Sequence, residues 1–297
     1  MKLEANNRNK YLKVKTMGGI QARLWRTVKF LILSVILMGY LVPFFLILIN
    51  SFKSKKTIIR TPLMLVDPNG LSLSNYTSAF KQMEYMKAFT NSLIITVCSL
   101  VFIIFLSSLA AYYFAREDTK ASKICFAAIV AAMVIPFQTL MIPLISIYGA
   151  KLGMLNKRET LIYLYVGFGM GLAIFVYHSF IRTSIPRSLE EASIIDGCSK
   201  YQTFFYIVFP LLKPTTATLI VLDVLWLWND YLLPSLILGK KALYTLPLST
   251  YVFYGTYSND LGKIMAGLIL TILPVIIIYL ILQKQIIDGV VAGAVKS

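Results

Sequence analysis

The chain has 297 residues, of which 58% are hydrophobic and only 14% are charged, and its formal net charge is +16. A mean hydropathy of +0.73 lies outside the range of ordinary soluble domains and indicates an integral membrane protein. The three cysteines and the single histidine, His178, form no closely spaced ligand set, so we expect neither a metal site nor a disulfide framework. The basic residues lie largely at the N-terminus and in loops beside apolar runs, where membrane lipid is a commoner partner than nucleic acid.

Six apolar stretches reach the length of about 20 residues that an α-helix needs to cross the hydrocarbon core of a bilayer. They predict transmembrane helices at residues 30–49, 92–113, 124–147, 160–180, 216–238 and 264–282. The predicted fold class is therefore all-α, a polytopic membrane protein with one six-span domain over residues 30–282. An even number of spans places both termini on the same side.

The first 29 residues form a basic arm that carries eight lysine and arginine residues against one acid, Glu4. By the positive-inside rule, this arm (1–29) lies in the cytoplasm. The loop 181–215 and the tail 283–297 are then cytoplasmic as well. No small-residue cleavage site follows the first apolar run, so we expect a retained span rather than a signal peptide.

Two prolines, Pro136 and Pro143, interrupt the third predicted span. Proline frees backbone groups and permits bends, which a moving pathway can use but which static helices also tolerate. Gln138 lies between them and is a candidate residue for a polar pathway or for an interface between subunits.

The loop 181–215 is too polar to cross the membrane and predicts two short helices. Pro186 suits the first turn of the first helix, and Glu190 and Glu191 complement the helix dipole near its start. The pair Asp196-Gly197 supplies the stop signal.

Ser199, with Gln202 three residues later, fits a capping box that starts the second helix. Its apolar block, 204–212, is about half the length of a span, and Pro210 and Pro214 end or bend the helix before the next span. Periodicity alone also allows an amphipathic helix lying on the membrane surface.

The order Glu191-Ala192-Ser193, then Gly197, then Ile207 and Pro210 resembles the EAA loop of permease subunits of bacterial ABC importers. The resemblance implies a coupling helix that docks in a cleft of a cytoplasmic ATPase subunit. It implies these docking residues: Glu190, Glu191, Ala192, Ser193, Asp196, Gly197, Ile207 and Pro210. Ser193 replaces the usual alanine, and Phe209 replaces a common leucine, so both change the size of a side chain on the docking face.

Further segments are similar to carbohydrate-uptake permeases, and specifically to the second permease of maltose-like pairs: MVIPFQTLMIPL (133–144), WNDYLLP (228–234) and GVVAGAVKS (289–297). The resemblance implies the type I ABC importer permease fold in a bacterial plasma membrane. It also implies that the tail, with Gly293 and Lys296, reaches into the ATPase dimer, although a frayed terminus is the simpler alternative.

The partners that the resemblance implies are a second permease subunit, an ATPase dimer, an extracellular solute-binding protein and a sugar. The chain has no GxxxxGK[ST] phosphate loop, so ATP and magnesium are expected on the partner ATPase. We therefore expect a transporter subunit, with no catalytic residue and no cofactor of its own.

The fifth predicted span carries Asp223, Trp226, Asn229 and Asp230. A carboxylate at mid-membrane costs about 2.5 to 3.5 kcal/mol on insertion scales, so it needs a partner or a wet cavity. At 100° per residue, Asp223, Trp226 and Asp230 share one stripe. The stripe either lines a sugar pathway or provides polar contacts between the two permeases.

One alternative function is an ion-coupled secondary carrier with Asp223 or Asp230 as the coupling carboxylate. Such carriers often contain internal repeats, which this sequence does not display, and they have no need of the EAA-like loop. An intramembrane enzyme is a more distant alternative, because no acid, base or metal constellation is present in the sequence.

Overall fold

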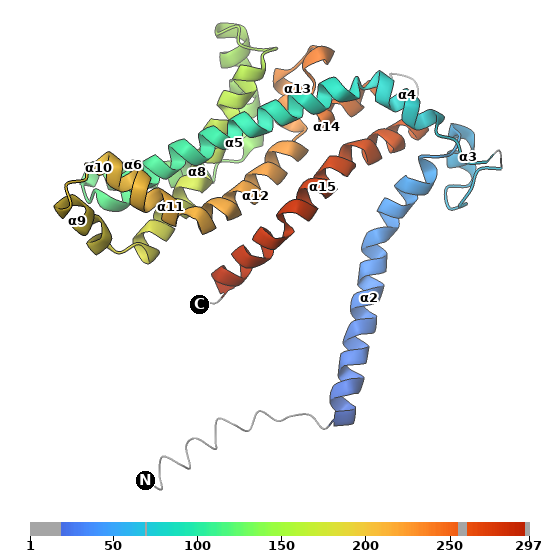
Figure 1. Ribbon diagram of the computed structural model, residues 1–297. Helices are drawn as coiled ribbons and strands as arrows, with labels where there is room; N and C mark the ends of the chain where they lie inside the picture. The colour runs from blue at the N-terminus through green and yellow to red at the C-terminus, as the bar shows by residue number, and fades with distance from the viewer. Residues whose placement is uncertain (1–18, 69, 255–259, 295–297) are drawn as a thin grey trace.

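The computed structural model describes residues 19–68, 70–254 and 260–294, with side chains for 23–68, 70–254 and 260–284. Its regular elements over these ranges are all helices (Figure 1). Four are long and apolar enough to cross a membrane: α2 (Gly19–Asn50), α5 (Tyr85–Arg116), α8 (Arg158–Ser184) and α15 (Leu261–Ala294). Two bent pairs raise the number of candidate spans to six. The predicted all-α polytopic fold is confirmed.

The centre of the bundle is the contact between α5 and α8, which lie side by side in Figure 1. Each helix buries a stripe with a spacing of four residues. The stripe on α5 is Ser99, Ile103, Ser107, Ala111 and Ala115, and the stripe on α8 is Leu161, Tyr165, Gly169, Ala173, Tyr177 and Ile181. A Cβ atom on Gly169 would lie 2.6 Å from Cδ1 of Ile103, so the two backbones approach as closely as small residues allow.

The two central helices run in the same direction. At one end, Arg158 Nη1 donates to Asn91 Oδ1 at 3.2 Å. At the other end, Arg116 Nη2 donates to the carbonyl of Ile185 at 2.9 Å. We call the Arg116 and Ile185 end the loop end, because the 181–215 loop follows there, and the opposite end the far end.

The third predicted span, 124–147, is not one continuous helix. It is divided into α6 (Lys120–Ala132) and α7 (Phe137–Leu144), which meet at 94°, followed by the π-helix η1 (Ile145–Lys151). Pro136 precedes α7 in an extended conformation and has no N–H to continue the helix, which accounts for the break. Pro143 lies inside α7 without ending it.

The fifth predicted span, 216–238, is also wrong as a single run. Helix α12 (Lys213–Asn229) ends at Asp230, and a separate short helix, α13 (Leu232–Ile237), follows. Asp230 is extended, with φ −69° and ψ 127°, and its Oδ1 accepts the N–H of Leu232 at 2.9 Å. The carboxylate thus satisfies a backbone donor at the start of α13 and stabilises the break.

Helix α2 stands away from the bundle except near its end, where the chain turns through α3 (Lys55–Arg60) and α4 (Ser74–Gln82) (Figure 1). The most apolar stretch of α2 contains no residue that is buried by the rest of the chain. The turn is anchored by Lys53, whose buried ammonium donates to Asn50 Oδ1 at 2.9 Å. Burial lowers the pKa of Lys53, and the charge of Asp67 opposes this shift.

The far end is closed by the segment between α13 and α15, which contains η3 (Lys241–Leu243), α14 (Leu246–Ser249) and η4 (Thr250–Phe253). Asn91 Nδ2 donates to two carbonyls in this segment, and Ser92 Oγ accepts the N–H of Leu246 at 2.8 Å. The first turns of α5 therefore hold the far-end segment in place.

Candidate functional site

The loop after α8 begins with helix α9 (Arg187–Ile195), preceded by Pro186 at its N-cap. It ends at Asp196, and Gly197 follows with φ +88°, a left-handed conformation that favours glycine. An added Cβ at Gly197 would meet nothing within 4 Å. The predicted first helix and its stop are therefore confirmed, and the glycine is required by backbone conformation rather than by crowding.

The predicted restart is confirmed by a complete capping box. Ser199 Oγ accepts the N–H of Gln202, and Gln202 Oε1 accepts the N–H of Ser199 at 2.8 Å. The chain continues as α10 (Lys200–Thr203), the π-helix η2 (Phe204–Val208) and α11 (Phe209–Leu211). It then bends by 70° into α12, after Pro210 and before Pro214.

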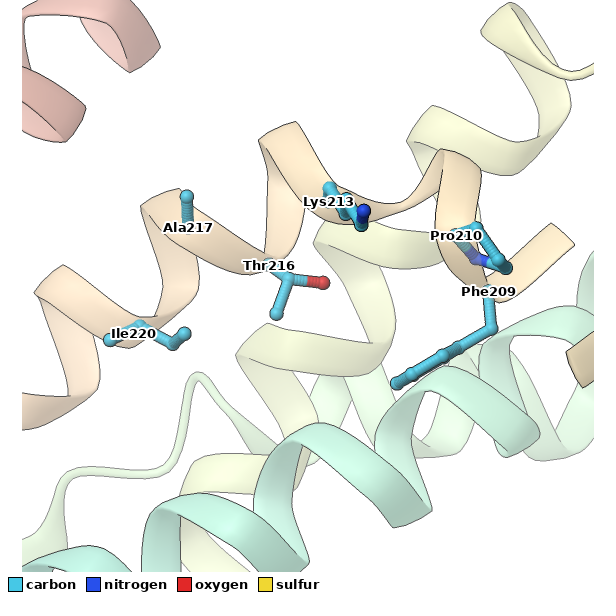
Figure 2. A pocket seen from close by; sticks show the side chains of 6 residues that line it. All are labelled: Phe209, Pro210, Lys213, Thr216, Ala217 and Ile220. Atoms are coloured by element: carbon cyan, nitrogen blue, oxygen red, sulfur yellow. The ribbon is translucent and has the colours of Figure 1, made fainter.

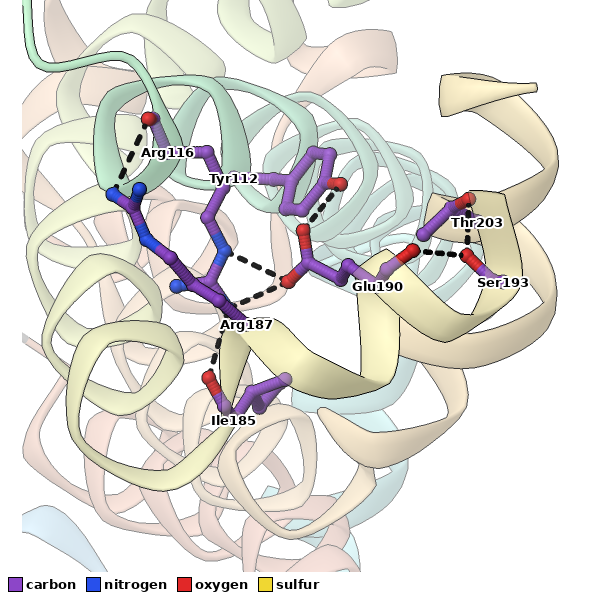
Figure 3. Close-up of polar contacts among 7 residues, drawn as sticks. All are labelled: Tyr112, Arg116, Ile185, Arg187, Glu190, Ser193 and Thr203. Atoms are coloured by element: carbon purple, nitrogen blue, oxygen red, sulfur yellow. Dashed lines mark hydrogen bonds and ion pairs between the residues drawn. The ribbon is translucent and has the colours of Figure 1, made fainter. Parts of the chain in front are cut away.

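Glu190 is turned inward, onto the last turns of α5 (Figure 3). Its Oε1 lies 2.6 Å from Nη2 and 2.7 Å from Nε of Arg116, and its Oε2 accepts the hydroxyl of Tyr112 at 2.9 Å. The side chains of Arg116 and Glu190 are only 15% and 11% exposed. Both carboxylate oxygens of Glu190 therefore have partners within this chain.

Ser193 joins the two limbs of the loop. Its hydroxyl donates to the carbonyl of Glu190 at 2.7 Å and shares a buried hydrogen bond of 2.8 Å with Thr203 (Figure 3). The serine that replaces the usual alanine thus has two polar partners within the loop. Its buried hydroxyl is therefore not left without a hydrogen bond.

The outer surface of the loop is apolar at its tip. Ile195 is 85% exposed, Tyr201 is 77% exposed and Ile194 is 55% exposed. Around them lie further exposed residues from the predicted docking set: Glu191, Ala192, Asp196 and Gly197. We call this combined surface of seven residues the docking face.

The last predicted docking residues lie in the second limb of the loop, in η2 and α11. Ile207 is half-buried and Pro210 is exposed. Pro210 lines a pocket of about 380 Å³ at the bend between α11 and α12 (Figure 2). The residues that line it are Phe209, Pro210, Lys213, Thr216, Ala217 and Ile220.

The polar residues of the fifth span divide between two surroundings. Asp223 is buried, and its Oδ2 has no hydrogen-bond partner among the described residues. Trp226 and Asp230 both contact Tyr165 of α8. The rings of Trp226 and Tyr165 pack edge to face, with 5.5 Å between the ring centroids. The Tyr165 hydroxyl donates a hydrogen bond to Asp230 Oδ2 at 2.8 Å. Asn229 is exposed at the end of α12.

The remaining predicted residues lie apart. Gln138 is exposed on α7. Gly293 belongs to α15 in a stretch without described side chains, and Lys296 lies outside the described residues. Among the described residues, no three His, Cys, Asp or Glu side chains gather in a way that could hold a metal ion.

Sequence reasoning missed three partners of the predicted residues: Arg116, Tyr112 and Tyr165. Arg116 ends an apolar span, where a basic residue is ordinary, and it lies 74 residues before Glu190 in the chain. A single sequence carries no signal for so distant a pairing. Tyr165 is likewise 65 residues from Asp230.

The sequence matches a known protein family over more than half of its length. The family described as "Binding-protein-dependent transport system inner membrane component" matches residues 103–290. This range runs from the middle of α5, through the whole loop, to the last turns of α15.

Individual relatives cover nearly the whole chain. The "Probable starch degradation products transport system permease protein AmyC" of Thermoanaerobacterium thermosulfurigenes is 44% identical over 86% of this chain and 91% of its own. The melibiose/raffinose/stachyose import permease protein MelC of Bacillus subtilis is 35% identical over 90% of this chain and 95% of its own.

The fold is similar to that of a chain in the crystal structure of a bacterial ABC transporter involved in the import of the acidic polysaccharide alginate. The TM-score is 0.73 at 20% sequence identity, and the match covers 91% of this chain and 99% of that one. Together with the family match, this similarity confirms the importer permease fold that the resemblance to carbohydrate-uptake permeases implied. The chain therefore belongs to the family of inner membrane components of binding-protein-dependent transport systems.

Proposed function

We propose that this chain is the transmembrane permease subunit of an ATP-driven sugar importer, with oligosaccharides as the substrate class. The observation that carries the proposal is the docking face: a short helix, a glycine turn and a capped second helix present exposed isoleucines and a tyrosine at the end of the bundle. The two relatives are import or transport permeases whose names refer to starch degradation products and to melibiose, raffinose and stachyose. The ion-coupled carrier has no support from the family or from these relatives.

The docking face is the surface for the ATPase subunit in this proposal. Ile195 and Tyr201 are too exposed to stabilise the isolated chain, so burying them against a partner gains apolar contact without disturbing this fold. Glu191 and Asp196 add negative charge to the surface. ATP and magnesium bind to the partner, since this chain has no phosphate loop. The tail, with Gly293 and Lys296, supplies a second contact to the ATPase.

A second permease completes the membrane part. The exposed apolar surface of α2 and the exposed end of α12, with Trp226 and Asn229, face either lipid, that permease or the pathway between the two. The loop end then lies in the cytoplasm with both termini, and the far end receives sugar from a solute-binding protein. Closure of the ATPase dimer moves the docked loop and shifts the bundle between outward and inward access.

Uptake by reconstituted vesicles tests this function. The chain is purified with the subunits encoded beside it and placed in liposomes, with a labelled malto-oligosaccharide and the solute-binding protein outside and ATP inside. We expect accumulation that requires ATP and the binding protein and is unaffected by ionophores. Accumulation that persists without ATP and is abolished by ionophores would establish an ion-coupled carrier instead.

A further inference from the structure

The contact between α9 and α5 is made by Arg116, which also reaches the end of α8. Arg116 approaches Glu190 with both Nε and Nη2, while the same Nη2 donates to the carbonyl of Ile185, the residue that follows α8. One guanidinium therefore joins the ends of α5 and α8 to the first turn of α9 (Figure 3). Its planar fork fixes an angle between these elements, which a flexible lysine would not do.

The second limb of the loop also packs on the last third of α5. The rings of Tyr112 and Phe204 pack with 5.2 Å between their centroids, and the rings of Phe105 and Phe205 stack with 6.3 Å between their centroids. An exposed ion pair between Lys200 and Glu117, with 3.8 Å between Nζ and Oε1, adds a weaker contact. The docking face is therefore linked to the end of α5 through side chains and to the end of α8 through the chain itself, and α5 is packed along α8.

Glu190 and its neighbour Glu191 have opposite surroundings. Glu191 is exposed on the docking face, whereas Glu190 is buried against Arg116 and Tyr112. A buried carboxylate with two partners and no free oxygen is poorly placed to bind a second protein, but well placed to hold a helix.

We propose that Arg116 and Glu190 are positioning residues that couple movement of the ATPase-docking helix α9 to the α5–α8 pair, and that Tyr112 orients the carboxylate. This inference rests on the proposed function. It separates two roles within one loop: the docking face binds the ATPase, and the Arg116–Glu190 pair transmits the movement.

The test uses the complete complex with Glu190→Gln, measuring both the ATPase retained on purification and the sugar transported per ATP hydrolysed. We expect the ATPase to remain bound and transport per ATP to fall by at least about 5-fold, the lower end of typical coupling between linked sites. Asp118→Asn is the matched control. It also removes one carboxylate at the loop end, from an exposed pair with Lys123, and should change neither quantity.

Reversal of the pair supplies the readout that a merely structural role would not give. Arg116→Glu alone should uncouple transport, and the double variant Arg116→Glu with Glu190→Arg should recover part of the transport per ATP. If Glu190→Gln prevents the chain itself from folding or from pairing with the second permease, Tyr112→Phe replaces it, since it removes one hydrogen bond and keeps the ring against Phe204. We then expect a smaller fall in transport per ATP.

The outcomes separate this inference from the function on which it rests. Normal transport per ATP in Glu190→Gln, in a complex whose wild type imports sugar with ATP, refutes the coupling role alone. Loss of the ATPase from Glu190→Gln but not from Asp118→Asn makes Glu190 a docking residue and also refutes it. Absence of ATP-driven uptake by the wild type refutes the proposed function itself.

Discussion

At the scale of single residues, the carboxylate of Asp230 stabilises a break in the membrane-embedded part of the chain. One oxygen accepts the N–H of Leu232, and the other accepts the hydroxyl of Tyr165, a side chain that is fully buried in α8. The chain can therefore leave a helix at Asn229 and start another at Leu232, whose backbone N–H is paired with the carboxylate. Asp230 holds α12 and α13 against α8.

The exchange Asp230→Ala should lower the thermal stability of the purified complex more than Tyr165→Phe does. The alanine removes two hydrogen bonds to a charged group, each worth about 1.5–3 kcal/mol, whereas the phenylalanine removes one. The double variant should be no less stable than Asp230→Ala within about 0.5 kcal/mol, because the two residues share the bond. Fully additive losses, or an unchanged melting temperature in Asp230→Ala, would show that these contacts do not stabilise the break.

At the scale of elements, α5 is distinguished by small residues along the face that meets α8. Ser99 and Ser107 are completely buried, and their hydroxyls have no hydrogen-bond partner among the described residues. Their small size therefore explains their presence better than their polarity does. Close backbone approach is the form of helix packing that membranes favour, because lipid leaves little hydrophobic gain for large side chains.

Ser107→Leu should separate α5 from α8 and reduce the yield of assembled complex, since a fully buried site has no room for the added atoms. Val101→Leu, at a position 58% exposed on the same helix, is the control and should assemble normally. The comparison is made by size-exclusion chromatography of the complex in detergent. Equal yields of the two variants would mean that the α5–α8 contact adapts to larger side chains.

The sequence was sufficient for elements whose signals are local. Apolar runs located the spans, and the signals for α9 and α10 lie within four residues of their caps, at Gly197 and in the Ser199 capping box. Pro136 and Pro143 indicated that the third span could bend, and the break lies directly before Pro136. The break at Asp230 was missed, because an apolar run is equally compatible with a straight and a bent helix. The pairing of Arg116 with Glu190 depends on the fold and was beyond any local pattern.

At the scale of the whole molecule, the docking face, the far end and α2 lie at separate places. The docking face lies at the loop end, the segment tied to Asn91 closes the far end, and α2 extends away from the helices that it precedes (Figure 1). An isolated chain leaves the docking face and the apolar side of α2 uncovered. We therefore interpret the molecule as one subunit of a larger assembly, in agreement with its family.

The central claim is that the docking face binds the ATPase, and co-purification tests it most directly. Gly197→Asp adds a carboxylate to the docking face at a glycine with φ +88° and open space around it. Gly153→Asp makes the same change at the far end, where the glycine has φ +58° and equally open space. A tagged chain is expressed with its partner subunits and recovered from solubilised membranes in each form. We predict that wild type and Gly153→Asp retain the ATPase while Gly197→Asp loses it; retention of the ATPase by all three, with uptake intact, would contradict the account.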